Sequence, residues 1–196
     1  MKRLTLRGRP ILGDIKLTLG PSETLALVGP SGVGKTSLLQ IIAGLQGAYE
    51  GHCHVRGRIG AVFQEPRLLP WRSVRDNLCI TTGITPAQAM QALAEVGLAE
   101  RHADFPEQLS LGQRRRLSLA RAFSVKPDVL LMDEPFVSLD PALVEEMMTL
   151  FTTLRTAHDV SAILVTHAKE EAERLADRIV TLGGAPAQIT SDVSNI

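Results

Sequence analysis

The segment Gly29-Pro30-Ser31-Gly32-Val33-Gly34-Lys35-Thr36 constrains the fold more than any other part of this chain. It matches the pattern G-x-x-x-x-G-K-[ST] and follows the apolar run Leu25–Val28, which reads as a buried strand. A helix is expected directly after it, from about Thr36 to Ala43. Glycines let a backbone wrap around phosphate oxygens, and a helix N-terminus presents free N–H groups.

A glycine turn without a ligand is the alternative, but packing alone does not require the entropy cost of so many glycines. Lys35 supplies a mobile charge for the outer phosphates, and the Thr36 hydroxyl is suited to Mg²⁺. The sequence therefore predicts a phosphate-binding loop made of Gly29, Pro30, Ser31, Gly32, Val33, Gly34, Lys35, Thr36 and Ser37.

Two carboxylates follow another apolar run, Val129–Met132. Asp133 is placed to hold Mg²⁺ from the end of a neighbouring strand, and Glu134 is placed to orient or deprotonate an attacking water. Polar residues after a strand can also mark simple loop entry. Beside a phosphate loop, the catalytic interpretation is favoured.

Continuous apolar runs predict central strands covered on both faces. Leu25–Val28, Val129–Met132 and Ala162–Val165 are such runs, and helices are expected from Pro141 to about Ala157 and from Lys169 to Ala176. Alternating strands and helices indicate an α/β core with a mostly parallel sheet.

The middle of the chain differs from this core. Helices are expected from Thr85 to about Val96 and from Ser110 to Ser124, which predicts a helical lobe inserted at about residues 72–124 of a single domain, 1–196. Alternating residues in Met1–Leu19 and Gly51–Phe63 favour an antiparallel β region at one side. After Gly184 only a short polar tail is expected.

The order of these motifs resembles the nucleotide-binding subunit of ATP-binding cassette (ABC) transporters, over nearly the whole chain. The resemblance implies a P-loop NTPase fold, ATP and Mg²⁺ as cofactors, and Mg²⁺-dependent ATP hydrolysis coupled to transport. Gln64, 29 residues after Lys35, resembles the hinge glutamine that reaches Mg²⁺ and the attacking water. His167 resembles the switch histidine that contacts the γ-phosphate and holds Glu134.

The same resemblance gives roles across a pair of chains. Leu109-Ser110-Leu111-Gly112-Gln113 resembles the signature segment, so Ser110, Gly112 and Gln113 are expected to bind ATP held by a second chain. Ser138-Leu139-Asp140 resembles the loop that crosses to the partner, with Asp140 as its contact. Ordinary helix capping also explains Ser110 with Gln113, and Asp140 with Pro141. Both interpretations can hold together.

The resemblance is to importers in particular. Leu68-Leu69-Pro70-Trp71-Arg72-Ser73-Val74 is similar to the branch that includes nitrate, sulfonate, taurine and thiamine importers, and it borders the groove where a permease helix docks. Trp71 in the core is the alternative. The implied partners are a second copy of this chain, integral-membrane permease subunits and a solute-binding protein. A non-transport ABC-type ATPase or a regulatory nucleotide-binding module remains the alternative function.

Two departures from the family pattern stand out. Leu111 replaces the usual first glycine of the signature segment, and a helix start provides backbone angles that leucine accepts. No aromatic residue precedes Tyr49, where the family stacks the adenine, so Leu6, Arg7 or Ile11 is expected to cover the base instead. Losing a stacking contact predicts that GTP is hydrolysed nearly as well as ATP.

Charge and composition bound the partners. Lys plus Arg and Asp plus Glu both number 21, so no net field recruits nucleic acid. Arg114, Arg115, Arg116 and Arg121 are interpreted as part of a mostly solvated helix, and Cys53 and Cys79 as buried thiols. No apolar run approaches the roughly 18 to 20 residues of a membrane span. The expected location is the cytoplasmic face of the bacterial inner membrane, reached through the permease.

Overall fold

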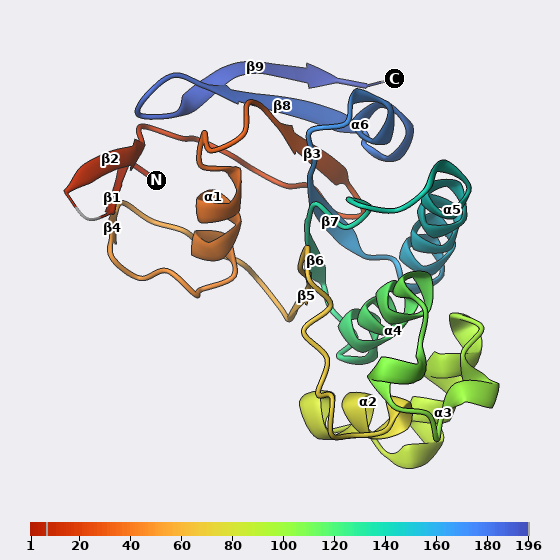
Figure 1. The fold of residues 1–196 in the computed structure, drawn as a ribbon. Coiled ribbons are helices and arrows are strands. Elements are labelled where there is room, and N and C mark those ends of the chain that lie inside the picture. The colour runs from red at the N-terminus through yellow and green to blue at the C-terminus, as the bar shows by residue number, and fades with distance from the viewer. Residues whose placement is uncertain (7, 196) are drawn as a thin grey trace. The chain divides into compact units, whose positions relative to one another are not determined.

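The apolar runs form the central strands of the structure, a computed structural model that describes residues 1–6 and 8–195 (Figure 1). The chain divides into two compact units. Unit 1 comprises Met1–Gly57, Leu131–Glu134 and Ser161–Ile196, and unit 2 comprises Arg58–Leu130 and Pro135–Val160. None of the described helices combines the length and the apolar character needed to cross a membrane.

Parallel strands make the centre of unit 1. Strand β3 (Thr24–Val28) pairs in parallel with β7 (Ser161–Val165) on one side and with β8 (Arg178–Gly183) on the other. The last residues of β6 (Val129–Asp133) lie beyond β7, and every residue of β7 is buried. The three strands predicted from continuous apolar runs are therefore confirmed.

The prediction of a polar tail after Gly184 is wrong. Residues Gln188–Ser194 form β9, which pairs antiparallel with β8 at the edge of the sheet. All but one of its residues are exposed, so backbone hydrogen bonds rather than apolar burial hold this strand. An apolar pattern consequently cannot reveal it.

Two helices and a second sheet complete unit 1. Helix α1 (Lys35–Ile42) buries Leu38, Leu39 and Ile41, and α6 (Lys169–Leu175) packs against β3 through a cluster of small residues, Ala26, Ala172 and Ala176. The antiparallel sheet has the order β2-β1-β4, with β2 at Arg9–Leu12, β1 at Arg3–Leu6 and β4 at Tyr49–Glu50.

The antiparallel region is only partly as predicted. Within Gly51–Phe63 the strand is β5 (Ile59–Val62), which belongs to unit 2 and lies next to the start of β6 instead of joining the antiparallel sheet. Residues 52–56 have no regular structure, and Cys53 is exposed rather than buried. Cys79 is half-buried.

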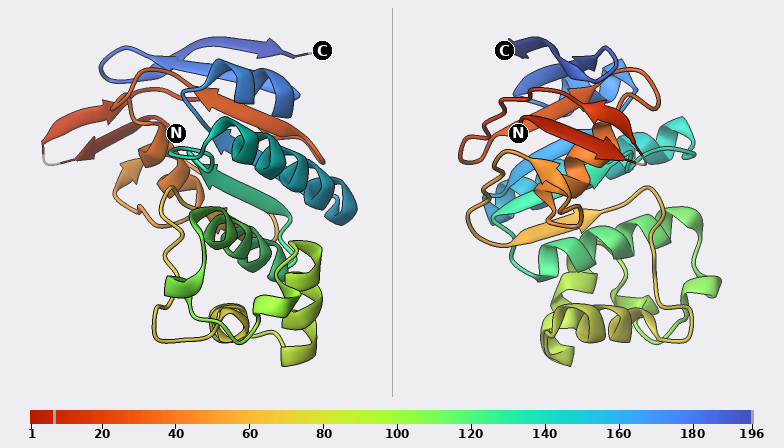
Figure 2. Two further views of the ribbon diagram at one scale, coloured as in Figure 1. Left: turned by 45° about the vertical axis from the view of Figure 1, so that its right-hand side comes forward. Right: turned by 90° about the vertical axis from the view of Figure 1, so that its left-hand side faces the viewer.

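Unit 2 is mostly helical (Figure 2). Its helices are α2 (Val74–Thr82), α3 (Pro86–Glu95), α4 (Leu111–Ser124) and α5 (Pro141–His158), with short 3₁₀ turns at Ala99–Arg101 and Pro106–Gln108. Helices α2, α3 and α4 contact one another, and α4 also contacts α5 and β5. A β-carbon on Gly60 would lie 2.7 Å from the Ala122 carbonyl oxygen, so β5 packs directly on the α4 backbone.

Candidate functional site

Glycine conformations shape the loop between β3 and α1 in unit 1. Gly29, Gly32 and Gly34 have φ of 146°, 76° and 115°, a region that residues with a β-carbon rarely occupy. A β-carbon on Gly34 would also come within 2.6 Å of Leu12 Cδ2. The strand, loop and helix predicted around this pattern are therefore all present, and the backbone angles at these three positions favour glycine.

Lys35 begins α1 and is buried, with 5% of its surface exposed. Its Nζ donates hydrogen bonds to the carbonyl oxygens of Gly29 at 2.8 Å and Pro30 at 3.0 Å. The side chain therefore folds back over the loop instead of extending into solvent. An ammonium held on a glycine loop at a helix N-terminus suits anionic phosphate groups.

Thr36 and Asp133 lie together at the carboxyl ends of the strands. The Thr36 hydroxyl donates to Asp133 Oδ1 at 3.1 Å, and Asp133 is buried at the end of β6. Hydroxyl and carboxylate oxygens are the hard ligands that Mg²⁺ prefers, and Mg²⁺ commonly adds substrate phosphate oxygens to one or two protein carboxylates. No group of three His, Cys, Asp or Glu residues in the described parts of the chain is arranged to hold a metal unaided.

Glu134 and His167 form a second pair in unit 1. Glu134 Oε1 lies 3.5 Å from His167 Nδ1, and the His167 side chain is 61% exposed. The Glu134 backbone has φ 46°, unusual for a residue with a long side chain, and its N–H donates to the Val165 carbonyl at 2.9 Å. This bond ties the end of β6 to the end of β7, so the carboxylate and the imidazole start from neighbouring strand ends.

Glu171 is a further carboxylate beside this pair, and the sequence interpretation missed it. Its Oε2 accepts a 2.5 Å hydrogen bond from the Thr166 hydroxyl, which itself accepts from the Ala168 N–H. Burial raises the pKa of Glu171, while Thr166 and His167 lower it and Glu134 raises it. The available signal was spacing, because Glu171 follows His167 by four residues at the start of a helix.

The predicted signature segment lies in unit 2, at the start of α4. Ser110 is the N-cap; its Oγ accepts from the Gln113 N–H at 3.2 Å, and Gln113 Oε1 accepts from the Ser110 N–H at 2.9 Å. This is the capping box that the local pattern allows. Leu111 takes the first helical position. Its φ is not positive, so its backbone is unstrained, as expected.

Gly112 and Asp140 both lie next to Leu143 of α5. A β-carbon on Gly112 would lie 2.9 Å from both Cδ atoms of Leu143, so a larger residue here would require the Leu143 side chain to move. Asp140 caps α5 by accepting from the Leu143 N–H at 3.0 Å, and Pro141 follows at the first helical position. The helix-capping interpretation of Asp140 is confirmed.

Gln64 is exposed and follows β5, and α4 holds the backbone around it. Arg115 donates to the carbonyl oxygens of Phe63 and Gln64, and Arg121 donates to those of Pro66 and Arg67. The prediction of a mostly solvated arginine helix is therefore wrong, since these guanidinium groups satisfy loop carbonyls that lie about fifty residues earlier in the chain.

Arg116 departs from that prediction as well. It forms an ion pair with Glu146 of α5 and donates to the Val96 carbonyl at 2.9 Å. Unit 1 thus holds the phosphate loop together with Asp133, Glu134 and His167, while unit 2 holds Gln64, Ser110, Gly112, Gln113 and Asp140.

Comparison with known proteins gives the family. A family model described as ABC transporter matches residues 12–137. The aliphatic sulfonates import ATP-binding protein SsuB 1 of Xanthomonas axonopodis pv. citri (strain 306) is 42% identical over 197 residues, covering 92% of this chain and 78% of that protein. The protein of the same name from Rhodococcus jostii (strain RHA1) is 44% identical over 182 residues, covering 90% and 74%.

A solved structure agrees with the fold. The ATP-binding cassette MJ0796, in a dimeric post-hydrolysis state bound to ADP and Pi, matches with a TM-score of 0.85 and 25% identity, covering 100% of this chain and 96% of that chain. The predicted P-loop NTPase fold, with a mostly parallel sheet and an antiparallel β region, is confirmed. From the match over residues 12–137 and from the relatives' identity over most of their length, the chain belongs to the ABC transporter family.

Proposed function

We propose that this chain binds and hydrolyses ATP to power the import of a small solute through membrane permease subunits. The observation that carries the proposal is the grouping, within unit 1, of a lysine-bearing phosphate loop, the Thr36–Asp133 pair and the Glu134–His167 pair. The relatives are named as ATP-binding proteins of aliphatic sulfonate import. Aliphatic sulfonates are therefore the first substrate class to test.

Nucleotide binding is assigned to Gly29 through Ser37. Loop N–H groups and the N-terminus of α1 bind phosphate oxygens, and Lys35 neutralises the outer phosphates. The match to an ABC structure bound to ADP and Pi supports a nucleotide as the ligand.

Mg²⁺ fits the donor set of Thr36 and Asp133, with Gln64 as a third ligand in the active assembly. Thr36, Asp133 and Gln64 would hold the Mg²⁺, which would neutralise negative charge that develops on the phosphate groups. Thr36 and Asp133 supply two oxygen ligands in fixed positions. Their hydroxyl and carboxylate groups are hydrogen-bonded to each other, and Thr36 lies on α1 while Asp133 lies on β6.

Glu134 is the group that accepts the proton of the attacking water. Its backbone is fixed by the hydrogen bond to Val165, and His167 lies within 3.5 Å of its carboxylate. His167 therefore orients Glu134 and is exposed enough to reach the γ-phosphate. Positioning of this kind is the main contribution an enzyme makes to phosphoryl transfer.

A second copy of the chain completes the site. Ser110, Gly112 and Gln113 of one chain are proposed to bind the ATP held by the other, and Asp140 to contact the opposite phosphate loop. The exposed Ser110 hydroxyl at a helix N-terminus suits a phosphate oxygen. The dimeric ADP-bound cassette supports this arrangement. In this proposal both units belong to one ATPase domain, residues 1–196, and its helical lobe spans about residues 72–124.

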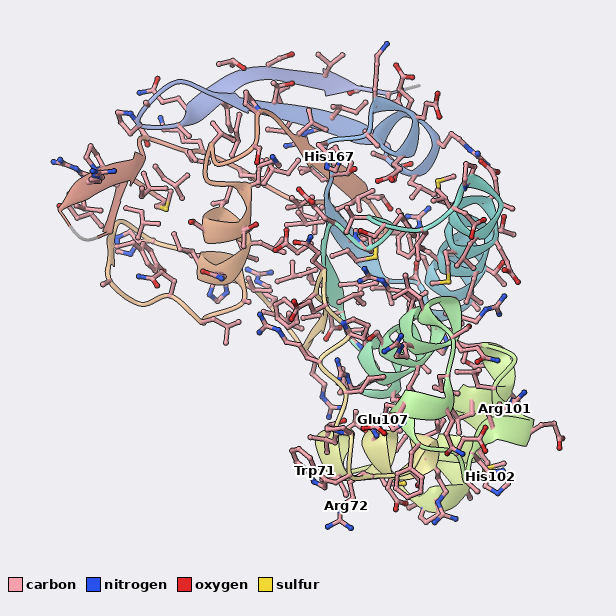
Figure 3. All side chains as sticks on the ribbon, in the orientation of Figure 1. Trp71, Arg72, Arg101, His102, Glu107 and His167 are labelled. Atoms are coloured by element: carbon pink, nitrogen blue, oxygen red, sulfur yellow. The ribbon has the colours of Figure 1, made fainter. Side chains whose placement is uncertain are left out.

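Permease subunits are the proposed membrane partners, with a solute-binding protein delivering the substrate. Trp71 is 68% exposed, so it is not a core residue, and it lies on the loop before α2 (Figure 3). Exposed aromatic side chains are common anchors at protein interfaces. Binding to the permease would hold the chain at the cytoplasmic face of the inner membrane.

The alternatives receive less support. The relatives shown above are named as import proteins, which does not favour a non-transport ATPase. The presence of Glu134 and His167, whose Oε1 and Nδ1 atoms lie 3.5 Å apart, favours turnover over a regulatory module that only binds ATP.

The Glu134→Gln variant tests the catalytic assignment. Removing the general base should lower kcat about 10²- to 10⁴-fold and leave ATP binding intact. Because ATP then persists, the variant should form an ATP-dependent dimer visible by size-exclusion chromatography. Glu50→Gln, at an exposed carboxylate on β4, is the matched control and should behave as wild type.

Two outcomes would contradict the proposal. Near-normal turnover by Glu134→Gln removes the catalytic role of this carboxylate. A variant that stays monomeric at saturating ATP removes the two-chain site.

A further inference from the structure

Arg115 is a buried cation that touches three backbone carbonyls from two separate segments of unit 2. Only 4% of its surface is exposed. Its Nη1 donates to Phe63 O at 3.3 Å and to Gln64 O, and its Nη2 donates to Val137 O at 3.2 Å. One guanidinium therefore holds the loop after β5 and the loop before α5.

Both segments lead into residues with proposed roles in ATP hydrolysis. The backbone carbonyl of Gln64 accepts a hydrogen bond from Arg115, and Gln64 is exposed. Val137 directly precedes Ser138, which has φ 64°, and Ser138-Leu139-Asp140 leads to the α5 cap. Arg115 itself sits on α4, five residues after Ser110. The Arg115 side chain thus links the Gln64 segment and the Val137 segment to the helix that begins with the signature segment.

Stability alone does not account for an arginine here. Within the described residues the Nε of Arg115 has no hydrogen-bond partner. Burial lowers the pKa of this guanidinium, as expected when charge leaves water. An apolar side chain of similar volume would fill the space without that penalty. The planar fork, in contrast, is suited to reach two acceptor groups at once.

We propose that Arg115 is a positioning residue that keeps Gln64 and the Ser138–Asp140 loop in register with the signature segment. The proposal rests on the proposed functions of Gln64, Ser110 and Asp140 in a two-chain site. Arg115 does not touch the nucleotide; it acts through the Gln64 and Val137 carbonyls. Its loss displaces groups that act during hydrolysis and leaves the phosphate loop of unit 1 unaltered.

Arg121 provides a matched control on the same helix. It donates to Arg67 O at 2.8 Å and Pro66 O at 2.7 Å, with a lowered pKa for the same reason of burial. It therefore holds the same loop by the same chemistry, but the carbonyls that accept from it are those of Pro66 and Arg67 and not those of Gln64 and Val137. Comparing the two arginines separates positioning of these two segments from general anchoring of the loop.

The experiment compares Arg115→Met, Arg115→Lys and Arg121→Met in the full chain. The readouts are kcat, the Kd for ATP, the number of ATP molecules bound per chain, and the melting temperature. Arg115→Met should lower kcat about tenfold or more, since small misplacements of catalytic groups cost this much. The Kd should stay within about twofold and the binding stoichiometry should be unchanged, because the phosphate loop is intact.

Arg115→Lys should lie between wild type and Arg115→Met, with kcat about threefold below wild type, because one ammonium reaches only one of the two segments. Arg121→Met should keep kcat within about threefold of wild type. If Arg115→Met does not fold, Arg115→Lys carries the test alone, and a wild-type kcat for it overturns the proposal.

Three further results would overturn it. These are a wild-type kcat for Arg115→Met, an equal loss of kcat in Arg121→Met, and a stoichiometry that falls in proportion to kcat. Glu134→Gln measured in parallel separates this proposal from the proposed function. Loss of turnover in Glu134→Gln with normal turnover in Arg115→Met rejects only the positioning role, whereas turnover in Glu134→Gln rejects the catalytic site itself.

Discussion

Residues of β2 lie against the loop that is proposed to bind phosphate. A β-carbon on Gly34 would lie 2.6 Å from Leu12 Cδ2 and 3.2 Å from Ile11 Cγ2. Ile11 is half-buried in β2 and therefore lies against the loop that carries Lys35. Of the three residues expected to cover the base, Arg7 and the side chain of Leu6 lie outside the described part of the structure, and Ile11 has this contact. Ile11 is the proposed base-covering residue.

Ile11→Tyr should raise the affinity for nucleotide. Base-aromatic stacking contributes about 1 to 3 kcal/mol in nucleic-acid proteins and acts on every base, whereas an aliphatic cover lacks it. The wild type should hydrolyse ATP and GTP with similar kcat/KM, and the variant should raise kcat/KM for both about fivefold. Arg3→Tyr, at an exposed position of β1, is the control. A wild type that strongly prefers ATP would contradict the assignment of an aliphatic cover.

Residue by residue, the sequence predicts groups whose role follows from a local pattern. Lys35, Thr36 and Asp133 belong to such patterns, and the structure brings them together as their spacing implies. Arg115 could not be found this way, because its acceptors at Phe63, Gln64 and Val137 are distant in the sequence. Periodicity treats a charged residue as solvated, and only the fold supplies its carbonyl partners.

Elements with continuous apolar runs were predictable, and those held by polar contacts were not. Helix α2 buries only Val74, Asn77 and Leu78, which leaves little periodic signal. Asn77 is fully buried; its amide accepts from the Leu69 N–H at 2.7 Å and donates to the Leu69, Arg72 and Ser73 carbonyls. This network fixes the loop that exposes Trp71, so the exposed indole belongs to a rigid structure.

Trp71→Ser should weaken binding to the permease without changing the fold. Truncating an interface anchor typically costs about 2 kcal/mol or more, equivalent to roughly thirtyfold in affinity. The measurement is permease-stimulated ATPase activity in reconstituted membranes, alongside ATP affinity and melting temperature of the isolated chain. Leu45→Ser is the control, because Leu45 is 65% exposed in unit 1 and Trp71 is 68% exposed. Normal stimulation of Trp71→Ser would remove this surface from the interface.

At the scale of the whole molecule, the motifs divide between the two units. Unit 1 carries the phosphate loop, Asp133, Glu134 and His167, and unit 2 carries the signature segment and Asp140. A division of this kind is consistent with a site that each chain shares with a second copy. In that case, a chain with a defect in a unit 1 motif should be complemented by a chain whose only defect lies in a unit 2 motif.

Mixing two inactive variants tests the shared site directly. Lys35→Ala removes the ammonium of the phosphate loop and should abolish nucleotide binding to that chain. Ser110→Asp keeps a good N-cap acceptor for α4 but places a negative charge where the γ-phosphate of the partner's ATP is proposed to lie. Ser110→Asn, a neutral N-cap of similar size, is the control for this added charge.

Each variant alone should have little activity, because both sites of its dimer carry the defect. If the two variants dimerise equally well, about half of the dimers in an equal mixture are mixed, and each mixed dimer contains one site with a normal Lys35 and a normal Ser110. The mixture should therefore recover about a quarter of wild-type activity per chain if the two sites turn over independently. Activity no greater than the sum of the separate variants would mean that Lys35 and Ser110 do not come from different chains, since a site built within one chain gains nothing from mixing.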